Sequence, residues 1–379
     1  MAPTRKTGPL PRRPCARSLA SGLLATALLA GCADLLVADA GGIRFEAEAG
    51  DPSTAPLFHS AKRLHEVAYR LKSGGVAWCE PFARHEVGLV YWSDAIAAQL
   101  GGAAGAGMLP RGPAPSVLFV ALDSAAGRAG VEPGDVLLAL DEVPLAGGAA
   151  GTEQLSRWTE ALGTAPRPTT LLLRRKDQTV SVALTPDRVC DFGIVLRNES
   201  YPRVRLATGH RLELNVGTVN MYNDDLLSFA LAHVMSHGVL RHDEATHSSM
   251  NAAQVADVPF FIVGFTLAVA SMGAYPQAAA MPFSTMNEAR LRKLEPEADL
   301  WGLAMMAAAG FDISRPRLLP VFDDLVSFEE RARESQARSD RLEQAATLLA
   351  QWQRSGRPLA PDPETLKALL PTATPGPSQ

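Results

Sequence analysis

The sequence predicts an α+β protein, in which a mainly helical body with a small edge sheet is interrupted by a β-rich module. Apolar residues recur at helical spacing between Leu57 and Leu71. From about residue 86, short apolar runs alternate with glycine and proline, a pattern typical of strands and turns. Beyond residue 205, one strand pattern is followed by long helical patterns. A β-rich segment between two helical parts indicates an insertion.

Residues 1–31 have the pattern of a secretory signal and are excluded from the fold. A short apolar run from Leu19 to Ala30 follows a basic stretch and is too short to span a bilayer. The run ends in a Leu-Ala-Gly-Cys sequence that resembles the bacterial lipobox. The resemblance implies lipidation of Cys32 and a protein that faces the periplasm, anchored to a membrane of the cell envelope. An ordinary signal peptide is the alternative.

Two of the four cysteines remain once the signal and Cys32 are set aside. Cys79 and Cys190 form an even pair, and an oxidising compartment favours a disulfide between them. Two buried free thiols are the alternative. Metal binding is disfavoured because neither cysteine belongs to a C-x-x-C motif.

The net charge of -4 provides no electrostatic footprint for a nucleic acid, so no nucleic-acid partner is expected. The chain beyond the signal is long enough for two cores. The expected parts are the signal 1–31, a tether 32–57, an N-terminal body helix 58–79, the module 80–189, the main body 190–356 and a disordered tail 357–379.

The module has a strand candidate at Ser116–Val120, then a small-residue segment that leads into Val131–Asp135 and another strand. Pro133 presets its backbone angle and Gly134 accepts positive φ, so the chain can turn back there. This segment resembles the bacterial PDZ domain. A second helix is expected at Gln154–Leu162, and a closing strand pair is expected at Thr170–Leu173 and Thr179–Leu184.

The PDZ resemblance implies a site for C-terminal peptides. PDZ domains hold an extended peptide by adding it to a sheet edge. Glu86–Val90 is the best candidate for the carboxylate-binding loop, with Gly88 and Leu89 as its binding residues. A module that serves only as a spacer is the alternative. A bond between Cys79 and Cys190 would hold the two ends of the insertion together.

The candidate chemistry lies beyond the module. Arg211–Val216 alternates as an edge strand does, and Leu212 and Leu214 are its expected substrate-binding residues. A helix capped by Asn223 then carries His233 and His237 one turn apart, so both rings can reach one ion. Taken alone, two core or surface histidines explain this pair equally well.

A second motif favours a metal site over two unrelated histidines. Glu295-Pro296-Glu297-Ala298-Asp299 begins a helical pattern that ends in an Ala-Gly-Phe-Asp sequence. The two motifs resemble those of HtpX-like and CAAX-prenyl-protease zinc metallopeptidases, over roughly residues 57–75 and 200–345. The resemblance implies a zincin-like body, a Zn²⁺ cofactor and polypeptide substrates. It also implies that His233, His237 and Glu295 are zinc ligands and that Asp299 orients a ligand histidine.

The chain departs from the family pattern at two places. Val234 stands where H-E-x-x-H enzymes have the glutamate that acts as general base. Losing acid–base help usually costs about 10²–10⁴-fold in rate, so activity as an enzyme is doubtful. The histidine that often precedes the family's last helix is also missing, which leaves Arg341 as the candidate for a substrate contact.

Three functions remain open. They are an active zinc endopeptidase in periplasmic protein quality control, a pseudo-peptidase that binds polypeptides, and a metal-free PDZ adaptor. Because Val234 cannot exchange a proton, the sequence favours the second. The nearly uncharged segment Val258–Ala274 is expected to form a buried or membrane-facing hairpin between the two motifs.

Overall fold

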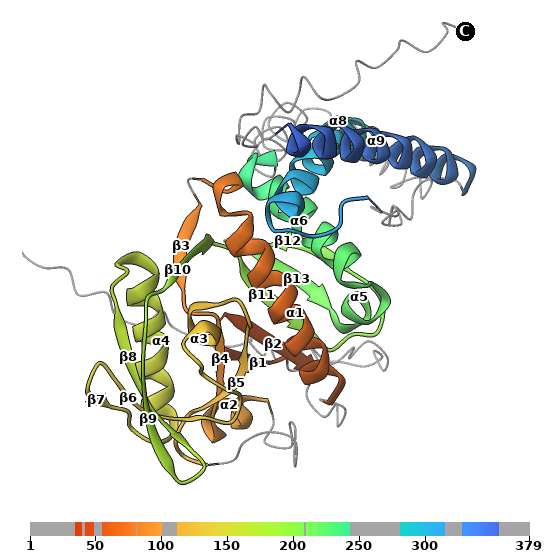
Figure 1. The fold of residues 1–379 in the computed structure, drawn as a ribbon. Coiled ribbons are helices and arrows are strands. Elements are labelled where there is room, and N and C mark those ends of the chain that lie inside the picture. The colour runs from red at the N-terminus through yellow and green to blue at the C-terminus, as the bar shows by residue number, and fades with distance from the viewer. Residues whose placement is uncertain are drawn as a thin grey trace, which may run out of the picture. The chain divides into compact units, whose positions relative to one another are not determined.

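The computed structural model describes residues 35–39, 42–48, 55–80, 82–100, 112–207, 210–242, 281–314 and 328–355. Helices combine with sheets of mixed direction, which confirms the α+β class (Figure 1). Four predictions lie outside the described residues: the signal 1–31, the lipidation of Cys32, the hairpin Val258–Ala274 and the tail 357–379. Within the described ranges, no helix is both long and apolar enough to cross a membrane.

A five-stranded sheet forms the β part of the body, in the order β1-β2-β11-β13-β12. Its strands are β1 (Leu35–Asp39), β2 (Ile43–Glu48), β11 (Gly193–Arg197), β12 (Val204–Ala207) and β13 (Arg211–Asn215). Strands β2, β11 and β13 are parallel, while β1 and β12 run antiparallel to their neighbours at the two edges. The sheet therefore joins segments from both sides of the module.

The prediction that residues 32–57 form a tether is wrong for its strand-forming part. Ile43 and Phe45 alternate with polar residues and are fully buried, so β2 packs one face into the core. The neighbouring alanines and glycines hid this short alternation. The N-terminal body helix is observed, although it begins at Ala55 rather than at residue 58.

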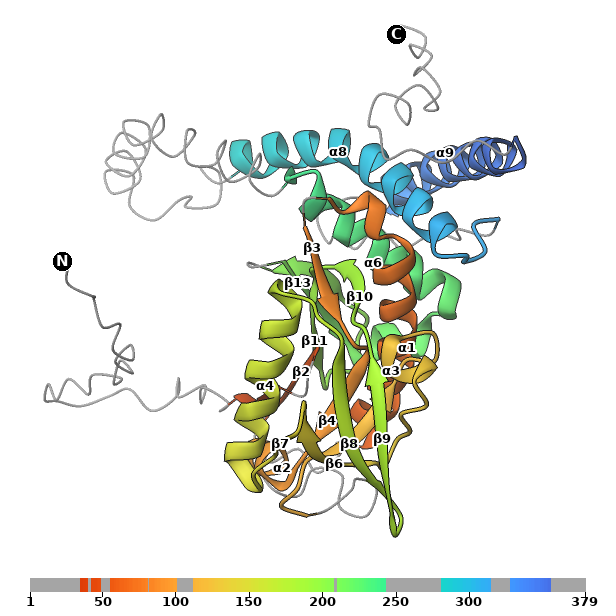
Figure 2. The ribbon, with the colours of Figure 1, turned by 60° about the vertical axis from the view of Figure 1, so that its left-hand side comes forward.

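Six helical elements complete the described part of the body. They are α1 (Ala55–Gly74), η1 (Val76–Trp78), α5 (Val216–Met221), α6 (Asp224–Val239), α8 (Met281–Ala308) and α9 (Phe328–Arg354). Leu57, Leu64 and Leu71 lie on the fully buried face of α1, which packs against α6 and α8. Helix α8 also contacts α6 and α9 (Figure 2).

The module is a second, antiparallel sheet in the order β4-β5-β6-β8-β9, with β7 paired to β6. Its elements are β4 (Leu89–Trp92), α2 (Asp94–Gln99), β5 (Ser116–Val120), α3 (Ala125–Arg128), β6 (Val136–Leu140), β7 (Val143–Pro144), α4 (Gly148–Thr164), β8 (Thr169–Arg175) and β9 (Gln178–Leu184). Gly134 adopts a φ of 92° in the predicted turn and donates its N–H to Val117 O at 2.8 Å. The buried Asp135 then receives two hydrogen bonds from Arg175, which fixes the turn to β8.

The two ends of the module meet at a short neck. Strands β3 (Ala83–Glu86) and β10 (Asp187–Cys190) pair antiparallel there. Cys79 and Cys190 form a disulfide across 111 positions of sequence, with their Cα atoms 5.7 Å apart. The bond closes the loop that contains the whole module, which restricts the unfolded chain.

Candidate metal centre and module cavity

Two helices bring the predicted ligands together. Helix α6 begins at an Asn223 cap, whose side chain accepts a hydrogen bond from Leu226 N at 2.9 Å. It carries His233 and His237, whereas α8 carries Glu295. A Cβ at Gly302 would lie only 3.0 Å from the backbone N of His233, so this glycine allows α8 to approach α6 closely.

Three donor groups converge between these helices, and each histidine lies nearest a different oxygen of Glu295. His233 Nε2 lies 3.2 Å from His237 Nε2 and 3.2 Å from Glu295 Oε2, and His237 Nε2 lies 3.3 Å from Glu295 Oε1. Tetrahedral ligands at about 2.0–2.1 Å from one zinc ion would be about 3.3–3.4 Å apart. The three donor groups form the candidate metal set of the described residues. Their spacing and chemistry therefore fit a zinc ion.

Asp299 lies behind His233, as the family resemblance implies. Its Oδ1 is 2.9 Å from His233 Nδ1, the ring nitrogen opposite the donor Nε2. Arg338 on α9 donates to both oxygens of Asp299, at 2.9 Å from Nε and 2.6 Å from an Nη. All three side chains are buried. This arrangement fixes the ring orientation of His233.

On the last helix the arginine that lies at the donor groups is Arg338, whereas the substrate contact of Arg341 stays a prediction. Arg338, three residues before Arg341, reaches the site, because its position is continuous with the buried Leu342 and Ala345 on one face of α9. Its partner is the carboxylate of Asp299 rather than a substrate oxygen. Only the packing of α9 against α8 distinguishes this arginine from the others on the helix.

Val234 projects no titratable group toward the donor set. The side chain is half-buried and packs against the hydrophobic core. A valine can neither accept nor donate a proton, so the residue after His233 leaves the site without the carboxylate of an H-E-x-x-H motif. The chain therefore has converging donor groups but no side chain at position 234 that can carry a proton.

The site carries one net negative charge when its imidazoles are neutral, because Glu295 and Asp299 face the single charge of Arg338. Burial disfavours a charged His233, but hydrogen bonds to Asp299 and Glu295 outweigh burial and raise its pKa to about 9. Burial alone would raise the pKa of Glu295, yet its two histidine partners hold that pKa far below the usual range. Glu295 and Asp299 thus favour a positive charge at His233, either the ring proton or a cation bound in its place.

A third histidine, His242, extends the cluster on the far side of His237. Its Nδ1 lies 3.0 Å from His237 Nδ1, and its Nε2 lies 3.6 Å from Glu297 Oε2. The structure buries His242 and half-buries Glu297, because the chain turns back after α6.

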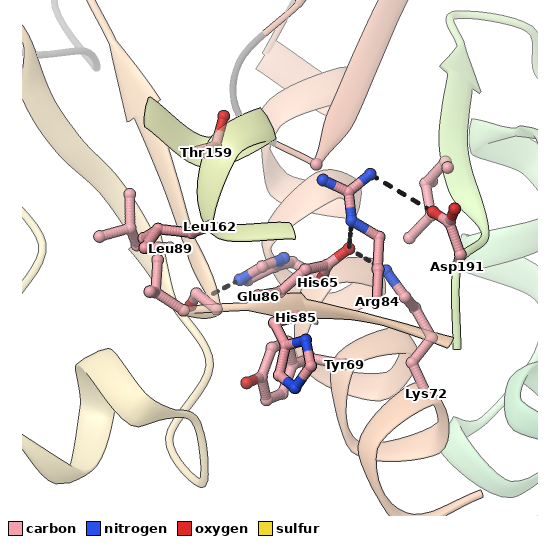
Figure 3. Close-up of a pocket in the computed structure, with 15 residues that line it drawn as sticks. His65, Tyr69, Lys72, Arg84, His85, Glu86, Leu89, Thr159, Leu162 and Asp191 are labelled. Atoms are coloured by element: carbon pink, nitrogen blue, oxygen red, sulfur yellow. Dashed lines mark hydrogen bonds and ion pairs between the residues drawn. The ribbon is translucent and has the colours of Figure 1, made fainter. Parts of the chain in front are cut away.

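A second candidate site is a cavity of about 120 Å³ beside Gly88 and Leu89 (Figure 3). Thr159 and Leu162 of α4 line it, and so does the buried Lys72 of α1. A Cβ at Gly88 would lie 2.2 Å from Ser124 Cβ, and its φ is 76°, so glycine fits this loop best. The predicted loop residues therefore border a hollow at the start of β4.

Charged side chains close one end of this cavity. Lys72 Nζ lies 2.7 Å from Glu86 Oε1, and Arg84 lies 3.3 Å from Asp191 Oδ1 (Figure 3). Burial lowers the pKa of His65 to about 4, and the resulting neutral ring lies with Nε2 3.1 Å from the carbonyl oxygen of Gly88. The cavity thus combines apolar walls with a polar end, as ligand pockets generally do.

The prediction of Leu212 and Leu214 as substrate-binding residues is wrong. Strand β13 is internal, because it pairs with β11 on one side and β12 on the other. Both leucines are fully buried in the core, so neither can contact a substrate. The edge strand beside α6 is β12 instead. Polar–apolar alternation reports one buried face but not which strand lies at the edge.

Comparisons with known proteins give partial likenesses to PDZ-containing structures. No family model matches the chain, and no curated protein matches it. The crystal structure of the HtrA3 PDZ domain bound to the phage-derived ligand FGRWV is 22% identical, covering 20% of this chain and 65% of that chain, with a TM-score of 0.17. The HtrA-type protease AlgW with decapeptide is 21% identical, covering 28% and 30%, with a TM-score of 0.20. This chain therefore spans less than two thirds of either structure. Nothing among these matches tests the zinc-peptidase resemblance.

The proton on His233 predicts a pH-dependent stability of the metal-free protein. Its pKa rises from 6.5 to about 9 on folding, so its stabilising contribution is complete below about pH 6.5 and disappears as the pH rises through 9. We expect the unfolding free energy of wild type minus that of His233→Gln to fall by up to about 3 kcal/mol across this window. Denaturant titrations with a chelator present measure it. A difference that does not change with pH contradicts the assigned contacts.

Proposed function

We propose that this protein is a zinc-binding, peptidase-derived protein of the bacterial cell envelope that binds polypeptides and hydrolyses them weakly or not at all. The observation that carries the proposal is the convergence of His233, His237 and Glu295, with donor separations of 3.2–3.3 Å. The signal pattern and Cys32 support a lipid-anchored location.

Zinc is the metal that the donor set favours. Two imidazole nitrogens and one carboxylate are the protein ligands of a class of catalytic zinc sites, in which water or substrate takes the fourth position. The net negative charge of the cluster and the contact from Asp299 to His233 both support a bound dication. Zinc in such a site polarises a carbonyl and lowers the pKa of its bound water to about 7.

The chain's own residues supply orientation but lack a proton carrier at position 234. Asp299 and Arg338 hold His233, and Glu295 approaches both histidines. Peptide hydrolysis also needs a group that takes a proton from the attacking water and delivers one to the leaving amine. Val234 cannot do either. The protein would therefore bind the metal but would not cleave peptides efficiently.

We expect the purified protein to bind one zinc ion per chain. His233→Ala and Glu295→Gln should each lose most of the bound zinc, because each removes one of three ligands. His59→Ala is the matched control, since His59 is exposed on α1. Elemental analysis after dialysis measures the stoichiometry. Folded wild-type protein that takes up no zinc would favour the metal-free adaptor.

Restoring the carboxylate should restore activity. We expect Val234→Glu to increase the cleavage rate of fluorescent casein by about 10²–10⁴-fold, the usual contribution of general acid–base catalysis. In Val234→Gln the side chain has the shape of glutamate but cannot act as a base, so this variant should cleave at the wild-type rate. Equal, substantial turnover by wild type and Val234→Glu would instead identify an active zinc endopeptidase.

We further propose that the module binds the C-terminal end of a polypeptide in the cavity beside Gly88. Leu89 and Leu162 provide apolar walls for a terminal side chain, and Lys72, which is paired with Glu86, lies at the polar end near the loop. All four residues of β4 are buried, and Trp92 packs edge-on against Phe58. The cavity is smaller than the about 300–1,000 Å³ of typical ligand pockets. It therefore suits the last residue of a peptide.

Filling the cavity should abolish this binding. We expect Thr159→Trp to weaken binding of a labelled FGRWV peptide at least about tenfold, because the indole would occupy the space of the terminal residue. Ser156→Trp, at an exposed position one turn earlier on α4, is the matched control. Fluorescence anisotropy measures the affinity. Equal binding of the amidated peptide would contradict recognition of the C-terminal end, and no binding by wild type would leave the module as a spacer.

A further inference from the structure

His242 contacts the candidate ligand His237 on the side of the ring away from the donor atom Nε2. The two Nδ1 atoms are 3.0 Å apart, and the ring centroids are 5.0 Å apart with planes at 73°. In an imidazole, Nδ1 and Nε2 lie on different sides of the ring. Because His237 presents Nε2 to His233 and Glu295, His242 lies outside the donor set.

We propose that His242 is a positioning residue that fixes the tautomer and the ring orientation of His237 for metal binding. This inference rests on the proposed zinc site and assigns a role to a residue that lies five positions beyond the second ligand. Ligand histidines generally donate their second ring N–H to a hydrogen-bond acceptor, which selects the tautomer. For His237 that acceptor is another imidazole.

One arrangement of protons is consistent with these contacts and with a metal bound at His237. A metal at Nε2 of His237 needs the lone pair there, so the ring proton is on Nδ1. This N–H donates to Nδ1 of His242, which must then carry its own proton on Nε2. That second N–H faces Glu297 Oε2 at 3.6 Å. In this arrangement His237 donates to His242, and His242 directs its own N–H toward Glu297.

The end of α6 is shaped to produce this contact. The helix ends at Val239, and Arg241 adopts a φ of 55°, the left-handed conformation that commonly ends helices. Leu240 N and Arg241 N bond back to Ser236 O and Gly238 O, at 2.9 and 3.1 Å. The turn carries His242 back over His237, where it is 5% exposed.

The two candidate histidine ligands are therefore oriented by different partners. The carboxylate of Asp299 contacts His233, whereas the imidazole of His242 contacts His237. Removing either contact should loosen its ligand without removing a donor atom. Loss of such outer partners typically costs about 10–100-fold in metal affinity.

Zinc affinity by chelator competition, together with the absorption spectrum of the Co²⁺-loaded protein, tests this role. We expect His242→Leu to bind zinc about 10–100-fold more weakly and to alter the Co²⁺ spectrum. His242→Asn keeps an acceptor near the place of Nδ1 and should recover most of the affinity. His59→Leu is the matched control for loss of a histidine, since His59 is exposed. Circular dichroism checks folding.

Glu297→Ala provides a second variant if His242→Leu fails to fold, because Glu297 is half-buried at the outer end of the chain of contacts. It should weaken zinc roughly two- to tenfold, less than the direct partner does. If wild type, His242→Leu and Glu297→Ala all bind zinc equally well, the role of His242 is overturned and the zinc site stands. Wild type that binds neither metal overturns the zinc site and this inference together.

Discussion

The buried ion pair between Asp299 and Arg338 is the interaction on which the candidate centre depends. Asp299 belongs to α8, Arg338 belongs to α9, and the histidine that Asp299 contacts belongs to α6. One carboxylate thus joins three helices from separate parts of the sequence. A buried charge without its partner is costly, so these helices have one favourable arrangement in which all three groups are satisfied. The ligand geometry follows from that arrangement.

The same constraint explains how the donor groups can keep their geometry beside a residue that cannot carry a proton. The positions of His233 and His237 depend on helix packing, on Gly302 and on contacts behind the rings. None of these contacts involves the side chain of Val234, which packs against the core. A change at that position can remove a proton carrier and leave the donors in place.

The sequence was sufficient to predict α6 and α8 with their donor residues, but not the side chains and strands that pack around them. The Asn223 cap and the histidine spacing are local signals, and the second motif gave Glu295 and Asp299 by resemblance. Arg338 could not be selected, because α9 contains many arginines and only tertiary packing distinguishes one of them. Similarly, alternation in Arg211–Asn215 predicted a strand but could not reveal its two neighbours. The strand containing Ile43 was missed because one of its two partners, β11, is distant in sequence.

The pairing of Ile43 with Ile194 has a consequence for how the chain is made. Strand β2 can pair with β1 at once, but it leaves the ribosome well before β11, with the entire module in between, so its other edge must wait for a partner. Such long-range pairing is slow to form, and an unpaired apolar edge is open to self-association in the meantime. Newly synthesised molecules therefore pass through a vulnerable period that ends only when the second half of the body arrives.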